Sequence, residues 1–344
     1  MKTLAVTLVI PHRNRSNEIQ RCLCSLQRAR AVPREVIVVD DCSRIEEQRL
    51  LYDIISEFKN LNIQMFRHNE HLGTSNAKNS GILKTKTPYI WFLDSDTEMI
   101  NPDALEVGCQ ILDKNPDIGV VAAEIVEDSN RQRYVREAYL LRSLWSAFIH
   151  HPLGDDIRKE VAFVATCNFL TRTDLIKEIG GFHSKLENGE DKLACLQIRA
   201  LGYKIFLDSR FGVLHYRSLI DKSQFWMRTR ITFRDCAFIY GATNGFWKLA
   251  TFHIDCMLSL WKLYKNNMEM FQLFIQHQEA LDVSQNSHWV MRLGEIVRLM
   301  VQYVLANKTY MAVKGYCFRL TSKMNSQTIQ DRARQHSKRL THEL

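Results

Sequence analysis

Long uninterrupted apolar runs are missing from this chain of 344 residues. Charged residues break the longest apolar stretches before the roughly 18 residues that a membrane-spanning helix needs, so no such helix is expected. Residues 4–10 form a short apolar stretch, but His12-Arg13-Asn14-Arg15 follows it where a signal peptide would have small residues. The sequence therefore predicts a cytoplasmic protein.

Internal repeats are also absent, and the nine cysteines show no metal-ligand spacing. Cys22 and Cys24 are the closest pair, but residues two apart on a helix point in different directions, which argues against a zinc site. An odd, scattered set is typical of reduced thiols in the cytosol. The hydrophobic fraction of 46% and the charged fraction of 24% are those of an ordinary globular protein with a sizeable core.

The net charge of +8 is unevenly distributed. Basic residues gather in residues 301–344 and in a second segment that contains Arg217, Arg228, Arg230 and Arg234. Such clusters bind nucleic acid, anionic lipid or phosphorylated substrates, and they also occur as ordinary solvated surface. Charge alone leaves these alternatives open.

Residues 89–93 are five large apolar residues, with Pro88 before them and two carboxylates, Asp94 and Asp96, after them. The run predicts a strand buried on both faces of a mostly parallel sheet. Open α/β sheets bind ligands at the carboxyl ends of their strands, so both carboxylates should project into a site. Two acidic oxygen donors suit Mg²⁺ or Mn²⁺. The alternative is that the acids only cap the next helix.

Strand and helix patterns alternate along the first part of the chain. Residues 4–10, 36–39 and 63–66 read as buried strands, with helical apolar spacing between them. Ser43 and Glu46 have the spacing of a capping box at the start of the second helix. This alternation predicts an α/β fold with a Rossmann-like, doubly wound, mostly parallel sheet.

Beyond Phe225 the pattern changes to long helical segments rich in Trp, Phe, Met and Leu. We therefore expect an α/β domain over residues 1–220 and a helical C-terminal region over residues 221–344.

Several short motifs resemble those of the inverting glycosyltransferases of family 2, which have the GT-A fold. They occur in the family's order and together cover roughly residues 4–217. The motifs are Val9-Ile10-Pro11-His12-Arg13-Asn14-Arg15, Val38-Val39-Asp40-Asp41-Cys42-Ser43, the run from Gly73 to Gly81, Leu93-Asp94-Ser95-Asp96, Ile179-Gly180-Gly181-Phe182, Gly189-Glu190-Asp191 and Val213-Leu214-His215.

The resemblance implies a nucleotide-sugar donor and assigns residues to it. Pro11 and Arg13 lie in the family's first nucleotide-contacting loop. Asp40 and Asp41 match an acidic pair, one member of which accepts a hydrogen bond from the pyrimidine N–H. The alternative for Asp41 is that it begins the turn before Ser43.

The resemblance also implies a divalent cation, Mn²⁺ or Mg²⁺. Asp94 and Asp96 match the family's metal motif, in which the second acid ligates the metal and the first contacts ribose or metal-bound water. His215 matches a position that completes the metal shell in some members, or it is a packed histidine. Lys78 and Asn79 match a pair that would hold the pyrophosphate, although an exposed lysine needs no such role.

Glu190 and Asp191 match the position of the general base that takes the acceptor's proton. Asp191 is the first choice and Glu190 the second; the alternative is that both are helix-start acids stabilised by the dipole. Two positions depart from the family pattern. The family commonly has another acid two residues after Asp191, where this chain has Leu193, and often an aspartate after Gly-Gly-Phe, where this chain has His183; both departures leave the acceptor open.

The sequence thus predicts a metal-dependent, inverting glycosyltransferase that moves one sugar from a UDP- or dTDP-sugar to an acceptor hydroxyl. The resemblance implies surface polysaccharide or glycolipid assembly, with a glycan or lipid-linked acceptor. Residues 221–344 would contact the acceptor or the inner face of the cell membrane, or form a packing or homo-oligomer surface. No nucleic-acid partner is expected.

Two other functions remain open at this point. One is a sugar-phosphate nucleotidyltransferase, against which stands the lack of a Gly-rich, Arg-Lys phosphate signature near the amino terminus. The other is a degenerate GT-A protein that binds sugar nucleotide or glycan without turnover.

Overall fold

The computed structural model describes residues 2–123, 125–127, 133–140, 145–151, 157–187 and 189–216, together with Asp235 and Ile239. The predicted helical region over residues 221–344 and the basic clusters within it lie outside the described residues, apart from those two positions. Among the helices of the described ranges, none is long and apolar enough to cross a membrane.

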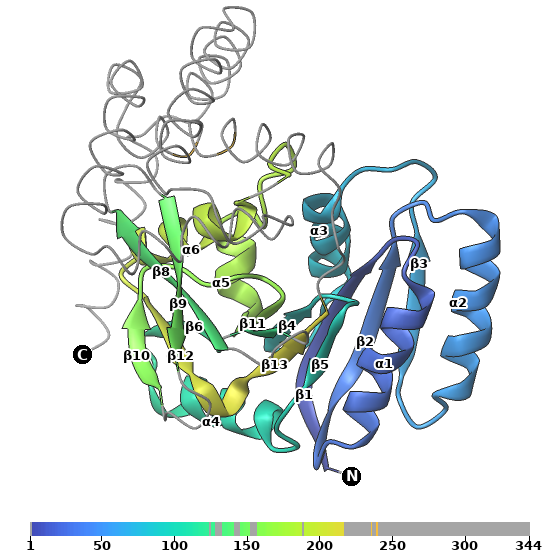
Figure 1. Ribbon diagram of the computed structural model, residues 1–344, viewed down its shortest axis with the longest axis horizontal. Coiled ribbons are helices and arrows are strands. Elements are labelled where there is room, and N and C mark those ends of the chain that lie inside the picture. Colours follow the sequence, from blue (N-terminus) through green and yellow to red (C-terminus); the bar gives the residue numbers. More distant parts are fainter. Residues whose placement is uncertain are drawn as a thin grey trace, which may run out of the picture. The chain divides into compact units, whose positions relative to one another are not determined.

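Eight strands form the main sheet, in the order β10-β12-β6-β11-β4-β1-β2-β3 (Figure 1). β1 is parallel to β2 and β4, β2 to β3, and β6 to β12. β11 is antiparallel to both of its neighbours, and β10 is antiparallel to β12 at one edge. The mostly parallel sheet predicted from the strand and helix alternation is therefore confirmed. The strands are β1 (Lys2–His12), β2 (Ala31–Asp40), β3 (Ile63–Arg67), β4 (Tyr89–Leu93), β6 (Ile118–Ala122), β10 (Arg158–Val161), β11 (Asn168–Arg172) and β12 (Lys204–Asp208).

A second sheet has the strand order β5-β13-β7-β8-β9. β5 (Thr97–Met99) pairs antiparallel with β13 (Val213–His215), which runs parallel to β7 (Ile125–Glu127). β8 (Arg133–Leu140) and β9 (Trp145–His151) complete it. The pairing of β5 with β13 joins segments that are far apart in the sequence.

The strand β4 is buried on both faces, as its unbroken apolar run predicts. Trp91 and Leu93 are fully buried and belong to the core on one side of the sheet. Phe92 points to the other side, where its ring packs edge-on against Phe182, with 5.0 Å between the centroids. Both faces of this strand therefore pack against protein.

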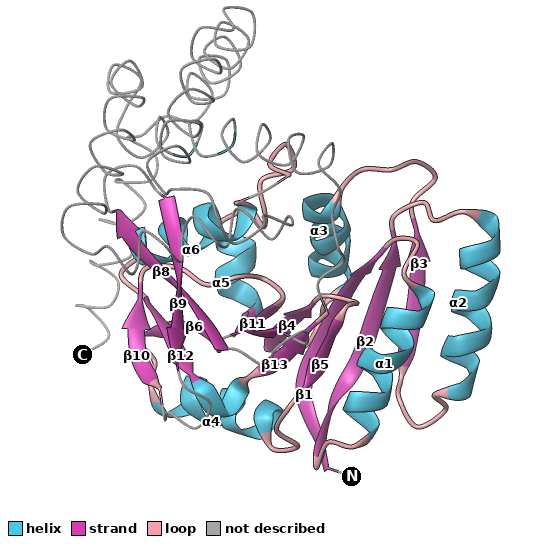
Figure 2. Cartoon of the chain, in the orientation of Figure 1, coloured by secondary structure: helices cyan, strands magenta, loops and turns pink. Residues whose placement is uncertain are grey.

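Helices cover both faces of the main sheet (Figure 2). Leu8 and Ile10 of β1 share a core cluster with residues of α1 (Ser16–Gln27), α2 (Ile45–Glu57) and α4 (Ala104–Lys114). Val9, between them, faces α3 (Thr74–Lys84), which contacts α5 (Thr173–Glu178), itself in contact with α6 (Glu190–Ala200). A 3-10 turn, η1 (Ser209–Phe211), precedes β13.

The predicted capping box at Ser43 is wrong. The helix α2 begins at Ile45, with Arg44 as its N-cap residue. Ser43 donates its backbone N–H, at 3.1 Å, and its hydroxyl to the carboxylate of Asp40. A hydrogen bond to an ionised carboxylate is stronger than one between neutral groups. Ser43 therefore binds Asp40 at the end of β2 and does not cap the helix.

Gly81 lets α3 lie directly on β1, because a Cβ at this position would be 2.3 Å from Cγ1 of Val9. We predict that Gly81→Ala lowers the free energy of unfolding by about 1–3 kcal/mol, since overpacking exceeds the gain in helix propensity. Urea unfolding measures this. Leu83→Ala, at an 82% exposed position of the same helix, should change the value by less than about 0.5 kcal/mol. Adding Val9→Ala should recover part of the loss; purely additive effects would contradict the overlap.

His12, the last residue of β1, is 2% exposed. Burial lowers its pKa to about 4, against opposing attraction from Asp40 and Glu47. His12 in the unfolded chain therefore binds a proton near pH 6.5, whereas His12 in the folded protein binds it only near pH 4. The free energy of unfolding falls as the pH falls from about 6.5 to about 4. We predict that the free energy of unfolding falls by about 3 kcal/mol over this pH range, and that the fall is absent in His12→Gln. Unfolding at pH 7, 5.5 and 4 checks it, and parallel pH profiles for the two proteins would contradict it.

Candidate active site

The carboxyl ends of β1, β2 and β4 meet at one edge of the sheet. His12, at the end of β1, is in register with Asp40, at the end of β2, and its carbonyl accepts the N–H of Asp41 at 2.8 Å. β1 also pairs in parallel with β4, whose end leads directly into Asp94. The acids predicted to lie at strand ends therefore lie along the same edge.

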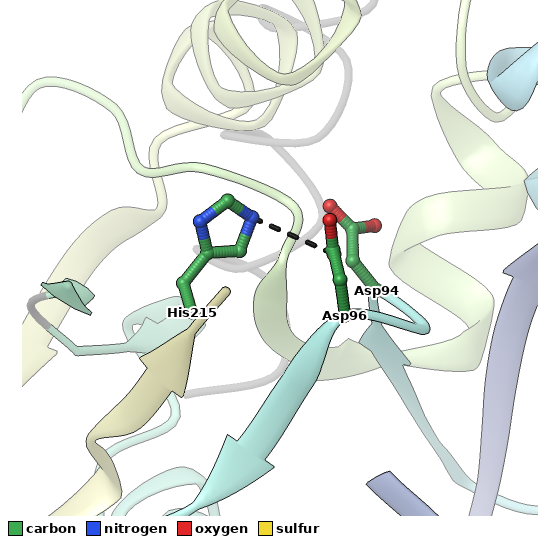
Figure 3. A group of neighbouring side chains, drawn as sticks. All are labelled: Asp94, Asp96 and His215. Atoms are coloured by element: carbon green, nitrogen blue, oxygen red, sulfur yellow. Dashed lines mark ion pairs between the residues drawn. The ribbon is translucent and has the colours of Figure 1, made fainter. Parts of the chain in front are cut away.

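Asp94, Asp96 and His215 form a cluster whose ligand atoms all lie within 4.8 Å of one another. Asp96 directly precedes β5, and His215 ends β13 opposite Thr97. Figure 3 shows the three side chains turned toward a common point, with His215 Nε2 3.5 Å from Asp96 Oδ1. The structure thus brings together the three residues that the sequence interpretation assigned to a metal.

The surroundings of this cluster fit a divalent cation. Burial raises the pKa of the Asp94 carboxyl; Lys78 opposes this, and the charge of Asp96 adds to it. Within the described ranges, Asp94 Oδ1 and His215 Nδ1 are buried and have no hydrogen-bond partner. Carboxylate oxygens with an imidazole are donors that Mn²⁺ accepts readily, and Mg²⁺ takes the carboxylates. A cation there would relieve the repulsion between the two acids.

Arg15 is a site residue whose partner the sequence interpretation missed. Its guanidinium forms an ion pair with Asp96 Oδ2, although the motif had placed it only in the nucleotide loop. Its position just beyond β1, next to β4 in the sheet, is the signal that could have revealed this pairing. Of the other loop residues, Pro11 is buried within β1 and Arg13 is exposed.

The two acids at the end of β2 have different surroundings. Asp40 is fully buried, and its carboxylate accepts from Ser43 and forms an ion pair with Arg67. Asp41 accepts hydrogen bonds from two histidines and from two backbone N–H groups that precede α3. Burial alone would raise the pKa of Asp41, but these hydrogen bonds outweigh it and lower the pKa below its usual value.

Lys78 and Asn79, predicted to hold a pyrophosphate, have partners within the protein. Lys78 is 1% exposed, and its ammonium lies 2.9 Å from Glu190 Oε1 and donates to Thr166. The amide of Asn79 exchanges two hydrogen bonds with the backbone of Phe182, at 2.7 and 2.8 Å. Both side chains thus tie α3 to the segments around α6, and their contact with a pyrophosphate stays a prediction.

The candidate bases Glu190 and Asp191 begin α6, after Gly189 at φ +99°. They are 8% and 6% exposed. Burial lowers the pKa of Lys78, but the charges of Glu190, Asp94 and Asp191 outweigh it, so the pKa is raised. One buried cation therefore lies among the candidate base, its neighbour and the first acid of the metal cluster.

Solved structures share this architecture. TarS of Staphylococcus aureus, in complex with UDP-GlcNAc, superposes with a TM-score of 0.53 at 18% identity, over 97% of this chain and 92% of that chain. The mannosyltransferase PcManGT of Pyrobaculum calidifontis, in complex with GDP-Man and Mn²⁺, gives 0.52 at 15% identity, over 93% and 86%. At these identities the likeness shows the fold, and the predicted GT-A fold is confirmed.

Sequence relatives point the same way. The pre-mycofactocin glycosyltransferase of Mycobacterium tuberculosis is 27% identical over 201 residues, which are 58% of this chain and 40% of that protein. The amylovoran biosynthesis glycosyltransferase AmsB of Erwinia amylovora is 25% identical over 251 residues, 68% of this chain and 81% of that protein. The match spans about two fifths of the length of the first curated relatives. The family model described as Glycosyl transferase family 2 matches residues 7–180, and the chain belongs to that family.

Proposed function

We propose that this protein is an inverting glycosyltransferase that moves a single sugar from a UDP- or dTDP-sugar to an acceptor hydroxyl with the help of Mn²⁺ or Mg²⁺. The observation that carries the proposal is the cluster of Asp94, Asp96 and His215, joined electrostatically through Lys78 to the start of α6. The complexes of the two structural neighbours, with UDP-GlcNAc and with GDP-Man and Mn²⁺, support a nucleotide-sugar donor and a metal.

On the donor side, Asp94, Asp96 and His215 would hold the divalent ion. When bound, that ion supplies positive charge against the diphosphate leaving group. Arg15 already lies on Asp96, so its guanidinium is placed to contact a donor phosphate, for which its planar fork is well suited.

On the acceptor side, Asp191 would accept the proton of the attacking hydroxyl. Glu190 is the second candidate, and its carboxylate forms the buried ion pair with Lys78. That pair would have a positioning role, because it ties the first turn of α6, which carries Asp191, to α3. Attack by the activated hydroxyl on the face opposite the diphosphate inverts the anomeric carbon in one displacement.

The acceptor and the setting are proposed more broadly. The Erwinia relative is named for amylovoran biosynthesis, which supports a role in surface polysaccharide or glycolipid assembly, with a glycan or lipid-linked acceptor. We place the donor site and the base within residues 1–220 and assign residues 221–344 to contacts with the acceptor, a membrane surface or a second copy. The working location would be the cytoplasm, with peripheral contact at the inner face of the membrane.

Thermal unfolding with UDP, dTDP, GDP and CDP, each with and without Mn²⁺, tests the donor site. We expect one pyrimidine diphosphate to stabilise the protein only with Mn²⁺, by about 2.7 kcal/mol at a hundredfold excess over its Kd. Asp96→Ala should abolish this shift, and His215→Ala should weaken it. Glu98→Gln, two residues beyond Asp96, is the matched control and should keep it. A full Mn²⁺-dependent shift in Asp96→Ala would contradict the metal assignment.

Asp191→Asn tests the base. We expect turnover, followed as UDP release from a panel of UDP-sugars with candidate acceptors, to fall about 10²- to 10⁴-fold. The Kd for UDP with Mn²⁺ should stay within about twofold, because Asp191 acts on the acceptor. Glu187→Gln, an exposed carboxylate just before α6, is the control and should keep its turnover. Turnover within tenfold of the unmodified protein in Asp191→Asn would exclude this base, and a product with the donor's anomeric configuration would exclude inversion.

A further inference from the structure

Hydrogen-bond donors from the protein itself occupy both carboxylate oxygens of Asp41. Oδ1 accepts from His68 Nδ1 and from the backbone N–H of Leu72, both at 2.8 Å. Oδ2 accepts from His71 Nδ1 at 2.7 Å and from the N–H of Gly73 at 2.8 Å. A carboxylate has about four lone-pair directions, so no direction is left for a ligand.

The protonation pattern follows from these contacts. The lowered pKa of Asp41 means that its carboxylate is ionised near neutral pH and only accepts hydrogen bonds. Both histidines must therefore donate from Nδ1. The second nitrogen of His68, Nε2, lies 2.9 Å from the hydroxyl of Ser80 on α3, so this ring is held at both ends.

The four donors differ in how easily they can leave. The N–H groups of Leu72 and Gly73 belong to the turn that opens α3, where Gly73 is the N-cap residue at φ +89°. The His68 side chain is 11% exposed and bridges Asp41 to Ser80. The His71 side chain is 52% exposed. Among the described residues, its ring has one hydrogen-bond partner, Asp41. His71 can therefore rotate into solvent without disturbing the turn or the helix.

Asp40 is less able than Asp41 to exchange one of its hydrogen-bond partners for a ligand. It is fully buried, its Oδ2 is in an ion pair with Arg67, and its Oδ1 accepts twice from Ser43. Releasing Asp40 would leave an unpaired buried charge, which is costly. Of the two acids at the end of β2, Asp41 is thus the one with a replaceable donor.

We propose that His71 is a gate on the carboxylate that reads the nucleotide base. In the unliganded protein His71 Nδ1–H occupies Asp41 Oδ2, and the imide N–H of a bound uracil or thymine takes its place as the ring swings outward. The inference rests on the proposed nucleotide-sugar donor. The exchange replaces one N–H···O hydrogen bond with another on the same oxygen, so an imide makes up for the hydrogen bond that the histidine loses. Cytosine carries no hydrogen on N3, so it cannot make this replacement through the same ring nitrogen.

If His71 is a gate, it weakens nucleotide binding, whereas a residue that contacts the base would strengthen it. His71→Ala leaves Oδ2 accessible, so UDP no longer has to displace an internal donor. We expect the Kd for UDP to fall about three- to tenfold, the equivalent of one ordinary hydrogen bond. UDP methylated at N3 lacks the imide hydrogen and should bind weakly to both proteins, without gaining from the substitution.

Calorimetric titration with Mn²⁺ present tests the gate, using UDP and N3-methyl-UDP on the full chain and on His71→Ala. Glu70→Gln, at the adjacent exposed position, is the control and should leave both Kd values unchanged. Thermal unfolding of each variant verifies the fold. Unchanged or weaker UDP binding by His71→Ala overturns the gate and leaves the proposed function standing, as does an equal gain for both nucleotides. If UDP does not bind the unmodified chain, the same titration is made with dTDP and its N3-methyl form. Failure of both UDP and dTDP to bind overturns the proposed function and the gate together.

Discussion

The buried ammonium group of Lys78 is the constraint on which the proposed site depends. A charge that is 1% exposed is tolerable only with close compensation, so carboxylates must gather around it. Glu190 supplies the direct ion pair, and Asp94 and Asp191 add their charges. These acids come from the end of β4 and the start of α6, while Lys78 lies on α3. The requirement to neutralise one cation thus brings the donor and acceptor sides of the proposed reaction together.

The edge of the main sheet adds a second layer of organisation. Asp40, Asp41 and Asp94 follow strands that end together, but each has a different set of partners. Asp40 is paired with Arg67 and Ser43. Asp41 accepts from several donors, of which the His71 side chain is exposed. Asp94 has a buried oxygen with no hydrogen-bond partner among the described residues. The same residue type therefore serves as a structural anchor, a proposed base reader and a proposed metal ligand, according to what surrounds it.

Some elements followed directly from local pattern. The run at residues 89–93 is apolar at every position, which is typical of a strand buried on both faces, and the acids after such a strand are expected at the sheet's carboxyl edge. The start of α2 was misjudged for an equally physical reason. A capping box considers only neighbours in sequence, whereas Ser43 found a buried carboxylate, that of Asp40, as its acceptor.

The sequence by itself determined the alternation of strands and helices, the burial of β4 and the presence of acids at strand ends, because periodicity and hydrophobicity act over a few residues. Only the tertiary structure decided that His215 lies beside Asp96, that Arg15 pairs with that same acid, and that Lys78 is buried against Glu190. Those contacts depend on the pairing of β5 with β13 and on the packing of α3 near α6, which join distant segments. Burial, which decides whether a charge meets water or another side chain, is a property of the assembled chain.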